Sequence, residues 1–190
     1  AKASCGFNDN PTAIDRACEE ILISSGLYEE AYRQYGLMVN RGGTNLATFR
    51  NIAKKYPMKE KVQILEDLIE MTPGEEGKWF ATAKSLGMLP LALRLAYRSP
   101  CDPRTLNRAA RDYLEKEPKF TLGVAMASLH WLTQGYGYEI TASDVLSAHD
   151  YALQAAEKLG LKEQVCEDIK KIVGQDTSPG MFVKDVLGRF

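Results

Sequence analysis

The stretch GLYEEA at residues 26–31 joins two segments in which apolar residues recur with helical spacing. Two similar phrases follow, GMLPLA at residues 87–92 and GLKEQV at residues 160–165. Each opens with glycine, which adopts the left-handed backbone conformation at little cost and commonly ends a helix. Each phrase therefore predicts a point where one helix stops and an antiparallel partner begins, and the sequence indicates stacked helical hairpins.

The composition is typical of a folded protein. The chain has 190 residues, of which 45% are hydrophobic and 26% are charged, with a net charge of −1. A spanning helix needs about 18 or more apolar residues in a row, and no stretch approaches that length, so we expect no membrane association. We predict a single helical-repeat domain over residues 1–190. Because the sequence does not begin with methionine, it is also compatible with a fragment of a larger protein.

The cysteines are far apart and form no C-x-x-C pair. Disulfide-rich secreted proteins space their cysteines densely, and zinc sites usually pair them closely. The spacing therefore favours buried or unreactive thiols in a reducing cytoplasm. The cysteines are Cys5, Cys18, Cys101 and Cys166.

Capping signals mark several helix starts. Thr72-Pro73 is followed by Glu75, Thr141 is followed by Asp144, and Asp102 precedes a proline, all of which are typical of a helix N-terminus. No segment shows the extended alternation of a strand. We therefore predict an all-α fold. The expected helices cover residues near 12–25, 27–39, 44–55, 58–71, 74–86, 88–98, 103–116, 118–134, 141–159 and 161–173, with a short last helix at 179–187.

The first glycine phrase extends to GLYEEAYRQY at residues 26–35, which resembles the turn and second helix of a tetratricopeptide repeat. By this resemblance Gly26 forms the turn, Tyr28 and Ala31 pack between helices, and Tyr35 lies on the same face. The resemblance implies a right-handed α-α superhelix, a solenoid of about ten helices in antiparallel hairpins. The phrases recur at spacings of 61 (26 to 87) and 73 (87 to 160), against about 34 in tandem repeats, so we expect irregular units.

Two further segments, SPCDPRTLNRAARDY at 99–113 and HWLTQGYGYEIT at 130–141, resemble helical C-terminal regions of large uncharacterised bacterial proteins. Some of those proteins are associated with SWIM-type zinc fingers. The cysteines and histidine of such a finger are not in this chain. The resemblance implies part of a bacterial multidomain protein.

Charge is segregated along the chain. Residues 41–61 carry six basic side chains and one acidic one. Residues 62–76 carry five acidic side chains and no basic one, and residues 77–111 carry seven basic side chains and one acidic one. The arginines of the last segment follow helical spacing, so their guanidinium groups could gather on one surface suited to carboxylate or phosphate partners. These residues are Arg94 and Arg98 on one expected helix and Arg104, Arg108 and Arg111 on the next.

Three interpretations of these arginines stay open. They could pair with acidic residues such as those of 66–76 and hold successive hairpins together. They could instead bind a protein or peptide partner. Nucleic-acid binding through the basic segments 41–61 and 77–111 is the alternative that the near-neutral net charge favours least.

Two loops offer further candidate binding residues. Arg41 precedes two glycines and Thr44, where backbone amides could bind an anion, although a threonine cap is the simpler interpretation. Tyr136 and Tyr138 lie in a glycine-rich loop. There they could anchor a partner or fold back over a helix pair to close the core.

The two histidines, His130 and His149, fall on separate expected helices, and a Cys101–His130 pair would need adjacency that the sequence does not show. We therefore predict no catalytic residue, no metal site and no cofactor. A small enzyme is the least favoured alternative. The sequence favours a protein-protein interaction scaffold that binds through a curved helical surface with an arginine-rich face, and it leaves the partner and the oligomeric state open.

Overall fold

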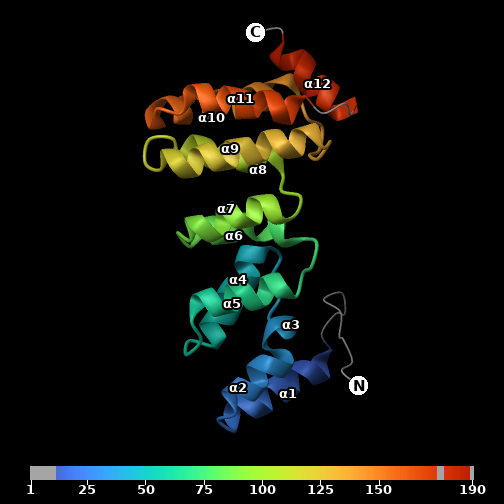
Figure 1. Cartoon of the computed structure of the whole chain (residues 1–190). Helices are drawn as coiled ribbons and strands as arrows, with labels where there is room; N and C mark the ends of the chain where they lie inside the picture. The colour runs from blue at the N-terminus through green and yellow to red at the C-terminus, as the bar shows by residue number, and fades with distance from the viewer. Residues whose placement is uncertain (1–11, 175–177, 189–190) are drawn as a thin grey trace.

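The computed structural model describes residues 12–174 and 178–188, which contain helices and no strand. The all-α prediction is thus confirmed for this part of the chain. Figure 1 shows the helices stacked in chain order, with α1 and α12 at opposite ends. The elements are α1 (Ala13–Ser24), α2 (Tyr28–Ala31), the π-helical turn η1 (Tyr32–Gly36), α3 (Leu37–Val39), α4 (Asn45–Lys55), α5 (Lys61–Glu70), the 3-10 turn η2 (Glu76–Trp79), α6 (Phe80–Ser85), α7 (Leu89–Arg98), α8 (Pro103–Tyr113), α9 (Pro118–Thr133), α10 (Ala142–Leu159), α11 (Lys162–Val173) and α12 (Ser178–Leu187).

The three glycine phrases end helices as predicted. Gly26, Gly87 and Gly160 have φ angles of 77°, 75° and 68°, in the left-handed region. After Gly26, the N–H of Leu27 donates to the carbonyl of Leu22 at 2.8 Å, which is the six-residue closure of a Schellman motif. The same closure follows the other two glycines. Each phrase turns the chain into the next helix.

Two details of the first hairpin differ from the prediction. The expected helix 27–39 is interrupted by the π-helical turn η1 between α2 and α3. Ala31 is buried, but Tyr28, expected to pack between helices, is 38% exposed. On α1, Ile14 and Ile21 are 73% and 63% exposed. The apolar face of α1 is therefore only partly covered by the rest of the described chain.

The predicted helix start at Thr72 was wrong. The Thr72 hydroxyl lies 3.2 Å from the carbonyl oxygen of Ile69, in the turn that ends α5, and it accepts a hydrogen bond from the indole N–H of Trp79 at 2.8 Å. With its hydroxyl engaged there, Thr72 does not cap a helix, and the backbone becomes helical only at Glu76. The other two predicted starts are confirmed. The Asp102 carboxylate accepts the N–H of Thr105 at 2.9 Å, and α10 begins directly after Thr141.

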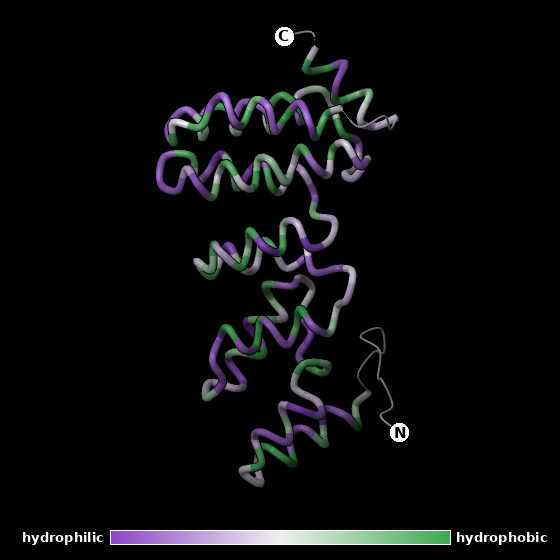
Figure 2. Tube along the Cα trace, viewed as in Figure 1, coloured by the Kyte–Doolittle hydropathy of each residue, from purple (hydrophilic) through white to green (hydrophobic). Residues whose placement is uncertain are grey.

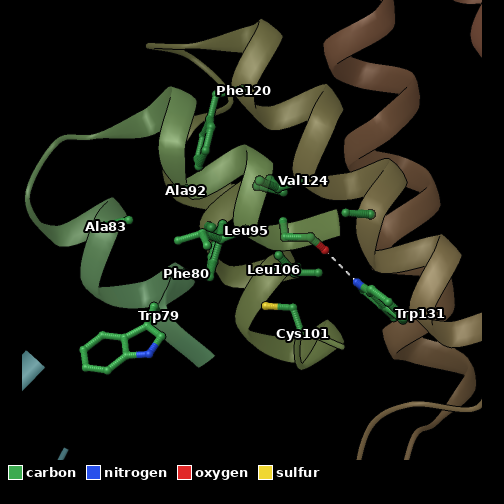
Figure 3. Close-up of a cluster of buried hydrophobic side chains, with 14 of the residues drawn as sticks. Trp79, Phe80, Ala83, Ala92, Leu95, Cys101, Leu106, Phe120, Val124 and Trp131 are labelled. Atoms are coloured by element: carbon green, nitrogen blue, oxygen red, sulfur yellow. Dashed lines mark hydrogen bonds between the residues drawn. The ribbon is translucent and has the colours of Figure 1, made fainter. Parts of the chain in front are cut away.

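A continuous core runs along the stack. Figure 2 shows apolar and polar segments alternating along the helices, as expected when each helix buries one side. In Figure 3, side chains of α6, α7, α8 and α9 gather around Leu95, and Phe80, Leu95, Leu106 and Val124 are all at most 1% exposed. None of the helices in the described part of the chain is both long and apolar enough to cross a membrane.

Gly77 marks the tightest backbone contact of this core. A Cβ atom at Gly77 would lie 2.6 Å from the carbonyl oxygens of Ser99 and Pro100, which cannot rotate away as a side chain could. We expect Gly77→Ala to lower the free energy of unfolding by about 1–3 kcal/mol, measured by urea unfolding monitored by circular dichroism. Gly43→Ala is the matched control, because nothing lies within 4 Å of its added Cβ. Equal unfolding midpoints for the two variants would contradict the claim that residue 77 has no room for a side chain.

Candidate binding groove between helices α8 and α10

Helices α8 and α10 pack side by side, and an open groove of about 510 Å³ lies between them. On α8, Arg104, Arg108 and Arg111 fall on one face because they are spaced by four and three residues. On α10, the facing residues follow the same period. The groove is lined by Asp102, Arg104, Asn107, Arg108, Arg111, Tyr138, Asp144, Ser147 and Tyr151. The structure thus brings together four of the residues proposed from the sequence.

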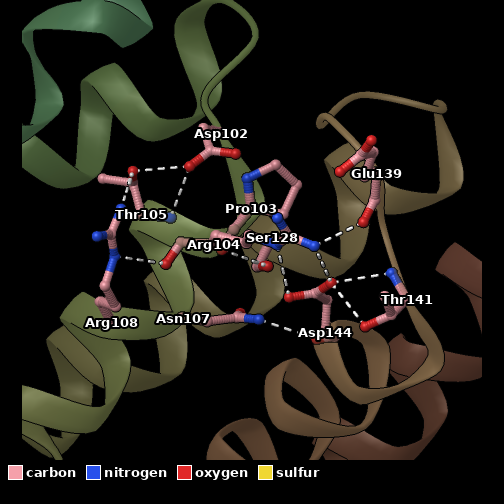
Figure 4. A network of polar contacts seen from close by, with 10 residues as sticks. All are labelled: Asp102, Pro103, Arg104, Thr105, Asn107, Arg108, Ser128, Glu139, Thr141 and Asp144. Atoms are coloured by element: carbon pink, nitrogen blue, oxygen red, sulfur yellow. Dashed lines mark hydrogen bonds and ion pairs between the residues drawn. The ribbon is translucent and has the colours of Figure 1, made fainter.

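Arg104 is held in place by the facing helix. Its Nε and Nη2 atoms donate to the two carboxylate oxygens of Asp144 at 3.1 and 3.2 Å, and Nη2 also donates to the carbonyl of Glu139 at 2.6 Å (Figure 4). Burial acts to raise the pKa of Asp144, but hydrogen bonds from Arg104 and Thr141 outweigh it, so this pKa is lowered. The pair is charged at neutral pH, and Arg104 ties α8 to the start of α10.

Arg108 and Arg111 make only local contacts. Arg108 donates to the carbonyl of Arg104 at 3.2 Å and to the hydroxyl of Thr105 at 3.1 Å, and Arg111 donates to the neighbouring Asp112 at 2.8 Å. Both side chains are exposed. A guanidinium has five N–H donors, so each keeps donors for another molecule.

The loop between α9 and α10 places its two tyrosines differently. Tyr138 is 77% exposed and lines the groove, as expected of a residue that contacts a partner. Tyr136 instead packs edge-on against Trp131, with ring centroids 5.2 Å apart. Tyr136 is 44% exposed, so its ring covers Trp131 only in part, and partner binding by Tyr138 stays a prediction. Next to Tyr138, Glu139 has a φ of 46°, the one positive value of a non-glycine residue in the described part of the chain.

Arg94 and Arg98 do not reach this groove. They line a different groove of about 360 Å³ with Glu66 and Glu70, between α5 and α7. The Nε atom of Arg98 lies 3.3 Å from the carboxylate of Glu76, as the pairing interpretation expected for this residue. The structure therefore does not gather all five arginines on one surface.

Arg41 lies half-buried in the loop before α4. In this loop the N–H of Gly42 donates to the hydroxyl of Thr48 at 2.9 Å, and the Thr44 hydroxyl accepts the N–H of Ala47 at 3.1 Å. The threonine cap is confirmed. Because the Gly42 amide is already bonded within the protein, the loop gives no support to an anion site.

Several basic side chains of segments 41–61 and 77–111 are paired with carboxylates. This pairing lowers the positive potential that a phosphate backbone would meet, so the structure adds no support to nucleic-acid binding. The pairs are Lys55–Glu19, Lys59–Glu29, Lys78–Glu75, Arg98–Glu76, Arg104–Asp144 and Arg111–Asp112.

The groups considered for catalysis are packed among other side chains. Burial raises the pKa of Cys101 to about 12, so this thiol does not supply a thiolate near neutral pH. His130 lies between the rings of Tyr97 and Trp131, at centroid distances of 6.5 and 4.7 Å. Cys18 and Cys166 are free and partly buried, and Cys5 lies outside the described residues.

Sequence reasoning missed the contribution of α10. Asp144, Ser147 and Tyr151 have the spacing of one helical face, and that spacing is visible in the sequence, but nothing local shows that the face lies opposite α8. Asn107 was missed for the same reason. It is 7% exposed, and its amide N–H donates to the backbone carbonyl of Asp144 at 2.8 Å.

Among the described residues no group of three histidine, cysteine, aspartate or glutamate side chains is placed to hold a metal ion. In comparisons with protein-family models, curated proteins and solved structures, the chain has no significant match.

Proposed function

We propose that this protein is a protein-protein interaction scaffold that binds a segment of its partner in the groove between α8 and α10. The observation that carries the proposal is the groove itself, which brings Arg104, Arg108 and Arg111 together with the exposed Tyr138. Two solvent-facing guanidinium groups and an exposed aromatic ring are side chains typical of protein interfaces.

The stacked arrangement supports this proposal. We infer that the hairpins form an irregular right-handed superhelix of the tetratricopeptide-like type, in which each pair of helices buries one face on the next. Such a stack presents an extended surface whose charge pattern selects the partner. We propose a cytoplasmic location, because free cysteines such as the buried Cys101 are compatible with a reducing compartment.

Charge reversal in the groove tests the proposal. We expect the variant R108E/R111E to lose capture of the partner from a cell lysate by about tenfold or more, because the reversed side chains would repel the groups that the arginines attract. Quantitative mass spectrometry of the captured proteins is the measurement. Both positions are exposed, so the variant should unfold within about 0.5 kcal/mol of the wild type.

The matched control is R50E/R94E, which reverses two exposed arginines outside the groove. Equal capture by R108E/R111E and the wild type would discard the groove as the binding site. Treating the lysate with nuclease tests the alternative function, nucleic-acid association. If capture depends on intact nucleic acid and falls with R50E/R94E, then nucleic-acid association through the basic segments would replace the protein-scaffold proposal.

A further inference from the structure

The groove separates its three arginines into two roles. The charge of Arg104 is neutralised by Asp144, and its guanidinium makes three hydrogen bonds within the protein. Arg108 and Arg111 have no bond to α10 among the described contacts, and both face solvent. Arg111 forms an ion pair with the neighbouring Asp112 at 2.8 Å, but this pair is exposed, and such surface pairs add little energy. The groups available to a partner are therefore Arg108 and Arg111, which lie about 4.5 Å apart along the helix axis.

This spacing suits an extended segment with acidic side chains. In an extended chain, alternate side chains point to the same side and lie about 6.6 Å apart, a separation that two long arginine side chains can match. Carboxylates accept bidentate bonds from guanidinium groups. Ser147 and Tyr151 on the opposite wall of the groove add hydroxyl donors.

Arg104 holds the loop that carries Tyr138. Its bond to the carbonyl of Glu139 is 2.6 Å long and fixes the residue next to Tyr138. Glu139 has a positive φ, which costs energy for a residue other than glycine and persists when surrounding contacts hold it. The Arg104 and Asp144 contacts, together with the bond from the Thr141 N–H to Asp144 at 2.9 Å, provide such contacts (Figure 4).

We propose that the groove recognises an extended acidic segment of the partner, whose carboxylates bind Arg108 and Arg111 while Tyr138 covers the segment. In this arrangement Arg104 is a positioning residue, which acts on the partner only by holding Tyr138. The proposal rests on the proposed function and names the chemistry of the partner at the same site.

Fluorescence anisotropy with synthetic peptides tests the recognised chemistry. The probe is a fluorescein-labelled peptide of about nine residues in which glutamate alternates with leucine, long enough to cover the groove when extended. Two matched peptides carry glutamine or phosphoserine at every glutamate position. We expect the glutamate peptide to bind about tenfold or more tightly than the glutamine peptide, and its affinity to fall as salt is raised. Equal binding of these two peptides would overturn the proposal, and binding of the phosphoserine peptide alone would replace the carboxylate with a phosphate.

Substitutions in the protein then test which arginines contact the peptide. We expect R108Q/R111Q to bind the glutamate peptide about tenfold or more weakly than the wild type, and R94Q, in the other arginine groove, to bind it equally. Full binding by R108Q/R111Q would overturn the assignment. If R108E/R111E abolishes capture of the partner but no acidic or phosphorylated peptide binds the wild type, the scaffold function stands and the acidic-segment proposal is wrong. If no such peptide binds and R108E/R111E captures the partner as well as the wild type does, the scaffold proposal and the acidic-segment proposal are both wrong.

A double-mutant cycle tests the role of Arg104. We expect R104Q and Y138A each to weaken peptide binding severalfold, and the combined variant to bind no more weakly than Y138A alone. Such non-additivity is specific to a residue that acts through Tyr138. Additive losses would show that Arg104 contributes to binding in another way, and they would contradict its positioning role.

Discussion

Glu19→Ala is expected to lower the free energy of unfolding by about 2–4 kcal/mol, because it removes a fully buried carboxylate that serves as the acceptor for several donors. Glu19 has no exposed surface. Its carboxylate accepts hydrogen bonds from the hydroxyl of Tyr56 at 2.5 Å and the amide of Asn40 at 2.6 Å, and it forms an ion pair with Lys55. Removing the carboxylate leaves the fully buried Tyr56 hydroxyl without its acceptor in the interface between α1 and α4. Asn40 loses one of two acceptors, because its amide also donates to the carbonyl of Gly36 at 2.8 Å.

The buried phenol strengthens this expectation. Burial raises the pKa of Tyr56, so its hydroxyl stays protonated and needs an acceptor across the physiological range. Urea unfolding monitored by circular dichroism measures the loss. The neighbouring Glu20 is exposed, and Glu20→Ala should stay within about 0.5 kcal/mol of the wild type. A loss for Glu19→Ala as small as that of Glu20→Ala would show that the carboxylate network adds little stability.

Local signals in the sequence account for the parts of the fold that were predicted. Gly26, Gly87 and Gly160 end helices because the left-handed conformation they adopt depends mainly on the residue itself. The cap at Asp102 was predictable for a similar reason, since its carboxylate bonds to a backbone N–H only three residues away. Thr72 carries the same kind of signal, but the Trp79 indole seven residues later takes its hydroxyl, and such a contact is not visible in a local pattern.

The candidate site shows the same difference between features set by the local sequence and contacts between distant residues. The spacing of Arg104, Arg108 and Arg111 fixes their common face as soon as α8 forms, so their grouping was predictable. The placement of Arg94 and Arg98 in another groove depends on how α7 packs beside α5, which helical spacing does not determine. The Arg104–Asp144 bond joins residues 40 positions apart, and only the packed structure reveals it.

Trp131→Ala is expected to destabilise the protein by about 3–5 kcal/mol, because it removes a large ring that is 8% exposed and leaves a cavity between helix pairs. The indole N–H of Trp131 donates to the carbonyl of Ala96 at 2.6 Å (Figure 3). Ala96 lies in the last turn of α7, where carbonyl groups have no N–H partner within the helix. The side chain thus fills space in the core and also caps a neighbouring helix.

Trp131→Phe separates these two contributions. Phenylalanine keeps an aromatic ring beside Tyr136 but has no N–H group, so we expect a smaller loss of about 1–3 kcal/mol, from the unpaired Ala96 carbonyl. Unfolding in urea, monitored by circular dichroism, compares the two variants with the wild type. Equal losses would show that the hydrogen bond dominates, and no loss in the phenylalanine variant would show that the carbonyl finds water. Because Tyr136 packs on Trp131 two residues before Tyr138, the alanine variant should also weaken acidic-peptide binding, whereas the phenylalanine variant should bind normally.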